Sequence, residues 1–136
     1  MVALTAPRNT PAMIGDVRGL PVKAAVRIFQ GAMVQTDVTG HAVPASATVA
    51  NVTLGRADAT ADNTGGANAA INAKVRRGVF RYGNSASTDL ITRAEIGKPC
   101  YVVDDQTVAK TSSSATRPVA GTVFDVDALG VWVEFP

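Results

Sequence analysis

Apolar and polar residues follow one another along this chain in short runs that end at turn-forming residues. Val22–Phe29 is β-branched and apolar with two polar interruptions, and Gln30 and Gly31 close it. Ile71–Val75 alternates strictly between apolar and polar positions, and Val131–Phe135 places Val131, Val133 and Phe135 on one face. Runs of this length and period predict β-strands.

Turn signals between further runs predict hairpins. Asp37–Gly40 has the composition of a tight turn, with glycine where a positive φ is tolerated, and it separates two short apolar runs. The other strands predicted from short apolar runs are Ala32–Val34, His41–Val43, Thr48–Leu54, Cys100–Val103, Thr107–Ala109 and Val119–Val126. The last of these and Val131–Phe135, joined by Asp127–Gly130, form the most clearly patterned hairpin in the chain.

Two interruptions of the strand pattern have their own interpretation. The Arg76–Gly78 step breaks the alternation before Val79–Tyr82 resumes it, which is the signature of a β-bulge in one continuous strand. Thr92 and Glu95 have the spacing of a capping box, with Gly97 and Pro99 after them, so one short helical turn is expected there.

The remaining segments have no strand or helix period. Residues 57–70 contain no apolar side chain larger than alanine and predict a mobile loop, and residues 110–118 predict a polar loop. Residues 1–21 carry three prolines and only isolated apolar residues, so they predict an extended arm, with a disordered terminus as the alternative. Four apolar residues of this arm are candidate anchors on a partner: Leu4, Met13, Ile14 and Leu20.

The fold class that follows is all-β: a small single-domain β-barrel or sandwich over residues 22–136, with the extended N-terminal arm 1–21 and at most one short helical turn. A chain of 136 residues has room for one such domain. Only 5% of its residues are aromatic, so its core is expected to consist mainly of Val, Ile, Leu and Ala.

The distribution of reactive side chains argues against an enzyme. The single cysteine, Cys100, and the single histidine, His41, exclude an intramolecular disulfide, a Cys-rich zinc site and a multi-histidine centre. Ser112–Ser114 lack the surroundings of a nucleophile and are interpreted as a loop. Late aspartates are interpreted as turn formers, with acid–base chemistry or calcium binding as weaker alternatives: Asp89, Asp104, Asp105, Asp125 and Asp127. No cofactor and no metal are expected.

Charge and hydropathy narrow the class of partner. Thirteen Lys and Arg against 11 acids give a net charge of +2, too small an excess to indicate nucleic-acid binding. Four cations gather around the predicted bulge, and they are interpreted either as a solvated strand face or as a docking stripe for an acidic protein: Lys74, Arg76, Arg77 and Arg81. No signal segment or membrane-spanning run is recognised, and the lone cysteine suits synthesis in a reducing compartment.

Several segments, in order, resemble a known family. They are Gly31–Val34, Val43–Ala45, Ala73–Arg81, Ile96–Val108, Val119–Asp127 and Gly130–Val133. Together they resemble the decoration, or cement, proteins of tailed-bacteriophage heads, and the likeness covers about residues 22–135. The chain departs from the family pattern in the insertion at 57–70 and the polar loop at 110–118.

The resemblance implies a non-catalytic structural protein made in the bacterial host cytoplasm and placed on the outer surface of the virion. Its partners would be the major capsid protein, whose neighbouring subunits it clamps after head expansion, and itself, as a homotrimer or else a dimer. No membrane or nucleic-acid partner is implied. The alternative function is a small β-barrel module that binds a glycan or single-stranded nucleic acid.

Overall fold

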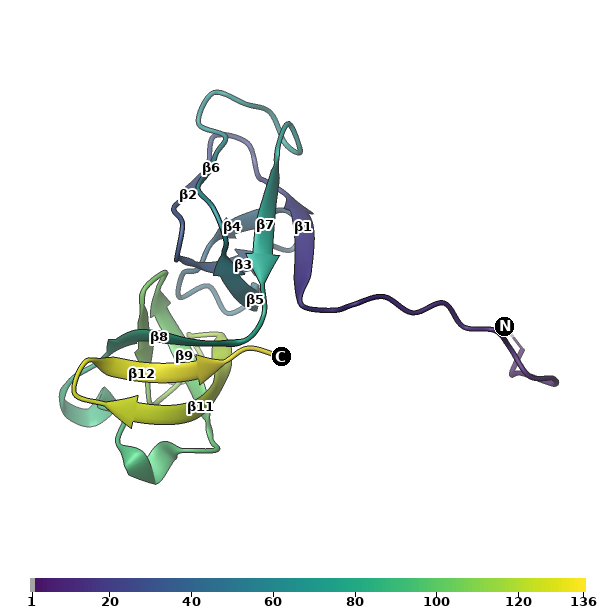
Figure 1. Cartoon of the computed structure of the whole chain (residues 1–136). Coiled ribbons are helices and arrows are strands. Elements are labelled where there is room, and N and C mark those ends of the chain that lie inside the picture. Colours follow the sequence, from purple (N-terminus) through teal and green to yellow (C-terminus); the bar gives the residue numbers. More distant parts are fainter. Residues whose placement is uncertain (1) are drawn as a thin grey trace.

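The computed structural model describes residues 2–136, and the chain is all β, as predicted. Its strands form two lobes, an upper one from the N-terminal half and a lower one from the C-terminal half (Figure 1). The N-terminal lobe contains β1 (Val17–Pro21), β2 (Arg27–Ile28), β3 (Met33–Thr36), β4 (Ala42–Pro44), β5 (Val52–Ala57), β6 (Ala61–Asp62) and β7 (Asn72–Arg76). The C-terminal lobe contains β8 (Val79–Asn84), the 3-10 turns η1 (Ser87–Asp89) and η2 (Arg93–Glu95), β9 (Pro99–Asp104), β10 (Thr107–Ala109), β11 (Val119–Asp127) and β12 (Gly130–Glu134).

The N-terminal lobe is built on an antiparallel five-stranded sheet in the order β1-β7-β5-β3-β4. A second, two-stranded ribbon of β2 and β6 lies beside it. Alternation along β7 explains how the sheet gains a core: Ala73 and Val75 are buried while Lys74 between them is exposed. The buried cluster is aliphatic and small, as the aromatic-poor composition predicts: Val22, Ile28, Ala32, Val34, Ala42, Ala57, Ala61, Ala73 and Val75.

The C-terminal lobe is a closed five-stranded barrel in the order β10-β8-β12-β11-β9. All its pairings are antiparallel except β10 with β8. Closure satisfies the strand edges within this lobe. The predicted terminal hairpin is confirmed as β11 and β12, and its buried face contributes Val123, Val131 and Val133 to the barrel core.

The predicted bulge at Arg76–Gly78 is instead the passage between the two lobes. β7 ends at Arg76 in the N-terminal sheet, and β8 begins at Val79 in the barrel. Gly78 lies between them with a φ of +152°, and a Cβ there would come within 3.3 Å of the Phe80 ring. The break in alternation therefore marks a change of sheet, which the sequence pattern does not distinguish from a bulge.

The two lobes are joined by contacts as well as by the chain. Met33 on β3 belongs to the barrel core, and its amide donates to the Asp105 carbonyl at 2.9 Å. The Tyr82 hydroxyl donates to the Gly31 carbonyl at 2.8 Å. The Arg56 guanidinium lies 4.2 Å from the centroid of the Phe80 ring. These contacts make one structural unit of two small cores.

Two further expectations about local structure are wrong. The segment Val22–Phe29 is not one strand, because the chain turns at Ala25, where φ is +59°, and only β2 remains extended. Residues 57–70 are not a free loop, because they contain β6 and a buried Asn63. The side-chain amide of Asn63 donates to the Lys23 carbonyl at 3.0 Å and to the Ala67 carbonyl at 2.9 Å.

The capping box is confirmed. Thr92 accepts from the Ala94 amide at 3.3 Å, and Glu95 accepts from the Thr92 amide at 2.6 Å, which closes η2. The three-residue turn η1 is an addition that the sequence did not predict. It begins at Ser87, a non-glycine residue with a φ of +57°.

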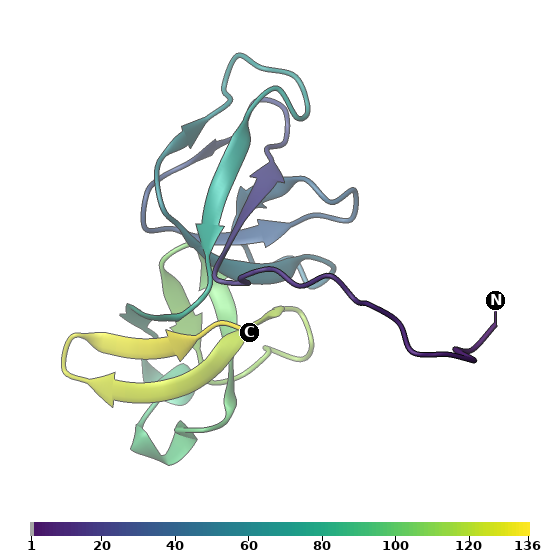
Figure 2. The same cartoon turned by 45° about the vertical axis from the view of Figure 1, so that its right-hand side comes forward.

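The arm is shorter than predicted. Residues 17–21 form β1, which pairs with β7 in antiparallel register, Val17 opposite Arg76 and Pro21 opposite Asn72. Leu20 packs against the N-terminal core and is therefore not available in the arm. The extended segment is residues 2–16, and it projects away from both lobes (Figures 1 and 2).

Candidate functional site

The arm, residues 2–16, presents apolar side chains that the body of the molecule does not cover. Every residue in this range is exposed, and Met13 is 92% exposed. Leu4 and Ile14, also predicted as anchors, are exposed in the same way. The arm is attached where the Arg77 amide donates to the Asp16 carbonyl at 2.9 Å. Fifteen extended residues reach about 50 Å, which is enough to cross onto a neighbouring molecule.

The four predicted cations do not form one stripe. Lys74 and Arg77 lie on and just after β7, whereas Arg81 lies on β8 in the other lobe. Arg81 is directed to Asp127, at 3.9 Å, and to the Trp132 ring, at 5.5 Å from its centroid. Arg76 is held by Asp58 at 3.1 Å. Only Lys74 and Arg77 of the four form no ion pair within residues 2–136.

Asp58 explains why Arg76 is not free. Its carboxylate accepts from Arg56 at 2.7 Å and from Arg76, so one anion is shared by two guanidinium groups. The hydrogen bond from Arg56 and the charge of Arg76 hold the pKa of Asp58 below its usual range, against an opposing effect of burial. Arg56 in turn lies over Phe80, so this group fastens the two lobes rather than facing a partner.

Two cations that the sequence analysis missed lie closer to the arm. Arg8 is in the arm, and Arg18 is in β1, which the register places beside β7. Both are exposed, and neither forms an ion pair in the part of the chain that the structure describes. Arg18 and Arg77 thus flank the foot of the arm at Asp16. Lys74 is directed to the other face of the β1–β7 pair, because Arg18 is opposite the inward-facing Val75. Only the pairing of β1 with β7, which periodicity does not reveal, brings Arg18 and Arg77 together.

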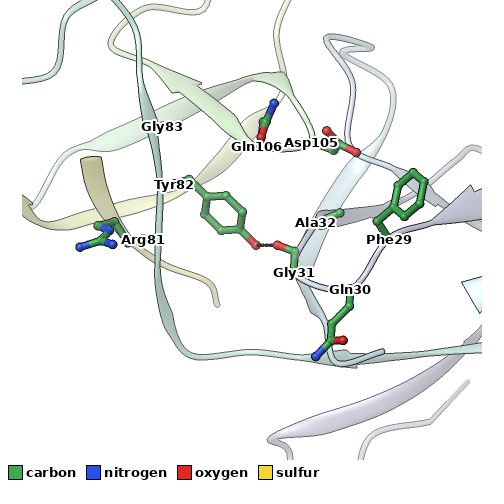
Figure 3. Close-up of a pocket in the computed structure, with 9 residues that line it drawn as sticks. All are labelled: Phe29, Gln30, Gly31, Ala32, Arg81, Tyr82, Gly83, Asp105 and Gln106. Carbon is green, nitrogen blue, oxygen red and sulfur yellow. Dashed lines mark hydrogen bonds between the residues drawn. The ribbon is translucent and has the colours of Figure 1, made fainter. Parts of the chain in front are cut away.

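A cleft of about 600 Å³ lies between the lobes, lined by residues 29–32, by Arg81–Gly83 and by Asp105 and Gln106 (Figure 3). The Tyr82 hydroxyl reaches across it to the Gly31 carbonyl, and burial raises the pKa of this hydroxyl. Burial, with the neighbouring charge of Asp104, also raises the pKa of Asp105. The guanidinium of Arg81 points out of the cleft, and Asp105 lies on the same side of the cleft as the Phe29 ring (Figure 3).

The candidate reactive residues are dispersed. Nδ1 of His41 forms a hydrogen bond of 2.8 Å with the Thr39 hydroxyl, within the same turn of the N-terminal lobe. Cys100 is buried in the barrel, where desolvation raises the pKa of its thiol to about 11. Ser112–Ser114 lie in the loop between β10 and β11. The structure does not bring these groups together.

The late aspartates mostly serve local structure. Asp104 and Asp127 accept backbone amides of their own turns, and Asp89 accepts from Thr111 and Arg117. Within residues 2–136, no group of three His, Cys, Asp or Glu side chains is arranged to hold a metal ion. In the same range no helix is long and apolar enough to cross a membrane. Comparison of the chain with family models, with curated proteins and with solved structures finds no significant match.

Proposed function

We propose that this protein is a decoration protein of a tailed-bacteriophage head, which binds the outer capsid surface through its N-terminal arm. The observation that carries the proposal is the exposed arm, residues 2–16, attached to a small β body. The order of motifs that resembles the decoration family supports the same function. The partner is the major capsid protein, and the protein stabilises contacts between its subunits.

The arm would act by becoming ordered on the shell. Met13 and Ile14 are almost fully exposed, and covering one such side chain contributes about 1.5–3 kcal/mol. Pro7 and Pro11 restrict the free arm, which lowers the entropy lost when it binds. The cations Arg18 and Arg77 at the foot of the arm would face carboxylates on the shell and steer the approach.

The test is a truncation that stops before β1. Deleting residues 2–14 keeps Asp16 and its hydrogen bond to Arg77, so the midpoint of thermal unfolding should change by less than about 2 °C. Occupancy on expanded heads, assembled from the proposed partner capsid protein, should fall at least about tenfold, because the apolar anchors are lost. Calorimetry and quantitative sedimentation with particles measure the two effects.

Matched variants separate the anchors from the length of the arm. Met13→Ser with Ile14→Ser should weaken particle binding, whereas Asn9→Ser with Thr10→Ser in the same arm should not. Deleting residues 2–21 also removes β1 and should lower the unfolding midpoint of the free protein. Full particle occupancy by the protein lacking residues 2–14 would show that the arm is not the capsid-binding element.

A ligand-binding module is the second candidate, and the cleft between the lobes is the observation that favours it. A glycan or a single-stranded oligonucleotide would contact Phe29 and the amides of Gln30 and Gln106. Titration with oligosaccharides and oligonucleotides, followed by the resonances of these residues, tests this function against binding to heads.

A further inference from the structure

Phe124 is an exposed aromatic residue in a chain that has few aromatic residues. It is one of only four phenylalanines in the chain, and it is 57% exposed rather than part of a core. The reason is a β-bulge: Val123 is opposite Val133 and Asp125 is opposite Trp132, so Phe124 is the extra residue of β11. A bulge re-aims a side chain, and here it directs Phe124 to the outside of the barrel while Val123 fills the core.

Trp132, beside Phe124, is held in one orientation. Its indole Nε1 donates to Oδ2 of Asp127 at 2.9 Å, and the Arg81 guanidinium lies 5.5 Å from the ring centroid. A side chain that is already fixed loses little entropy when a partner covers it. Trp and Arg are also the residue types that most often contribute the binding energy of protein interfaces.

A hollow lies between this hairpin and the start of β8, and a side chain projects from the turn of the hairpin. Val79, Phe124, Asp125 and Trp132 line a hollow of about 410 Å³ on the outer face of the barrel. Leu129, in the turn between β11 and β12, is 74% exposed. Its amide donates to Oδ1 of Asp127 at 2.8 Å, which fixes the turn and so the position of Leu129. Leu129 thus offers an apolar projection, and the hollow, apart from Asp125, offers an apolar lining.

The charges around the hollow are of both signs. Arg93 and Asp125, 3.5 Å apart, lie at one edge, and Arg81 and Asp127 lie toward the turn. All four side chains are at least 40% exposed. A surface with both signs at its rim can exchange these pairs with a copy of itself, whereas a rim of one sign would repel its copy.

We propose that the β11–β12 hairpin is the self-association surface of this protein, with Leu129 of one copy seated in the Val79–Phe124–Trp132 hollow of a second copy. The turn of this hairpin projects away from the arm (Figures 1 and 2). Self-association therefore leaves the arm and the cations at its foot free. A reciprocal contact gives a dimer, and a head-to-tail contact closes a ring such as a trimer.

The experiment measures the mass of the purified full chain by analytical ultracentrifugation from about 1 to 100 μM. The protein should form an oligomer, and Phe124→Ser or Leu129→Ser should each weaken its association at least tenfold. Phe29→Ser is the matched control, because Phe29 is 58% exposed on the other lobe, and it should leave the mass unchanged. An equimolar mixture of the Phe124→Ser and Leu129→Ser proteins should regain a heterodimer, since one intact projection then meets one intact hollow.

No particle is needed for this test, so its result is independent of the proposed function. Circular dichroism and thermal unfolding show whether each variant is folded, and these exposed positions should not alter either. A monomer at every concentration overturns the proposal, and so does an oligomer that neither substitution weakens. A Phe124→Ser protein that keeps its oligomer but loses occupancy on heads would also overturn it, and would assign the hollow to the shell.

Discussion

At the scale of single residues, Gln35 shows how one buried polar side chain holds in place a segment that contains no strand. Gln35 is fully buried in β3, and all the hydrogen-bonding capacity of its side chain is used. Nε2 donates to the Ser46 carbonyl at 3.1 Å and to Thr53 at 3.3 Å, while Oε1 accepts from the Ser46 amide and from Asn51. One side chain therefore positions the connection from β4 to β5.

Replacing Gln35 by leucine should lower the free energy of unfolding by about 2–4 kcal/mol, because the Ser46 amide and carbonyl lose their partner in a partly buried site. Urea unfolding measures this change. Gln30→Leu is the control, since Gln30 is exposed, and it should change stability by no more than about 0.5 kcal/mol. Equal effects of the two substitutions would mean that the Gln35 hydrogen bonds contribute nothing net.

At the scale of elements, the sequence pattern predicted the structures that depend on neighbouring residues. It failed where a strand pairs with a partner far away in the chain. The hairpin β11–β12, the turn at Asp37–Gly40 and the capping box at Thr92 each depend on a few neighbouring residues, and each is confirmed. The strand β1 was missed because it has no strand period of its own: its partner β7 lies more than 50 residues away.

Contacts between residues far apart in the chain also explain which features of the candidate site the sequence pattern did not predict. Lys74 and Arg76 have the same parity along β7, yet the carboxylate of Asp58, just after β5, holds Arg76 in an ion pair. Arg18 comes near Arg77 only through the β1–β7 register. A sequence gives the charges of a strand but not the strand that lies beside it.

The cations beside the foot of the arm lead to a prediction about how charge affects binding to heads. The double variant Arg18→Glu and Arg77→Glu should bind heads more weakly than the parent at low salt, and the difference should shrink as salt is added. Exposed ion pairs contribute only about 0–1 kcal/mol each, so any one of these changes alone should have little effect.

Lys98→Glu is the control for the charge variants. Lys98 is exposed on the barrel and forms no ion pair among residues 2–136, and its reversal should leave particle binding unchanged. If the double variant binds as well as the parent at low salt, Arg18 and Arg77 are only solvated surface residues.

At the scale of the whole molecule, two small cores are combined by polar and aromatic contacts at their junction. Phe80 and Tyr82 on β8 both contact Phe135, with ring centroids 6.2 and 5.9 Å away, and both also reach the N-terminal lobe. Neither lobe has a large core of its own, so we expect the junction to make the two unfold together.

Carboxylates distributed over both lobes determine how the stability of the molecule depends on pH. Hydrogen bonds and nearby cations lower the pKa of six of them in the folded state: Asp37, Asp58, Asp62, Asp89, Glu95 and Asp127. Such a group stabilises the fold above its unfolded pKa, and this contribution is lost as the pH falls through its folded pKa. Asp105, whose pKa burial raises, acts in the opposite direction, but it is one group against six.

Stability should therefore change little between pH 7 and pH 5 and fall steeply below the ordinary aspartate pKa of 3.8. The urea midpoint, measured at intervals from pH 7 to pH 2.5, checks this dependence. Asp58→Asn should be less stable than the parent at pH 7, and the difference should narrow as the pH falls below 3.8, because the parent then loses stability as its carboxylate takes up a proton. A parent midpoint that stays constant down to pH 2.5 would contradict the prediction, because carboxylates bound as these are by arginine, threonine and backbone donors must give up part of that binding when they take up a proton.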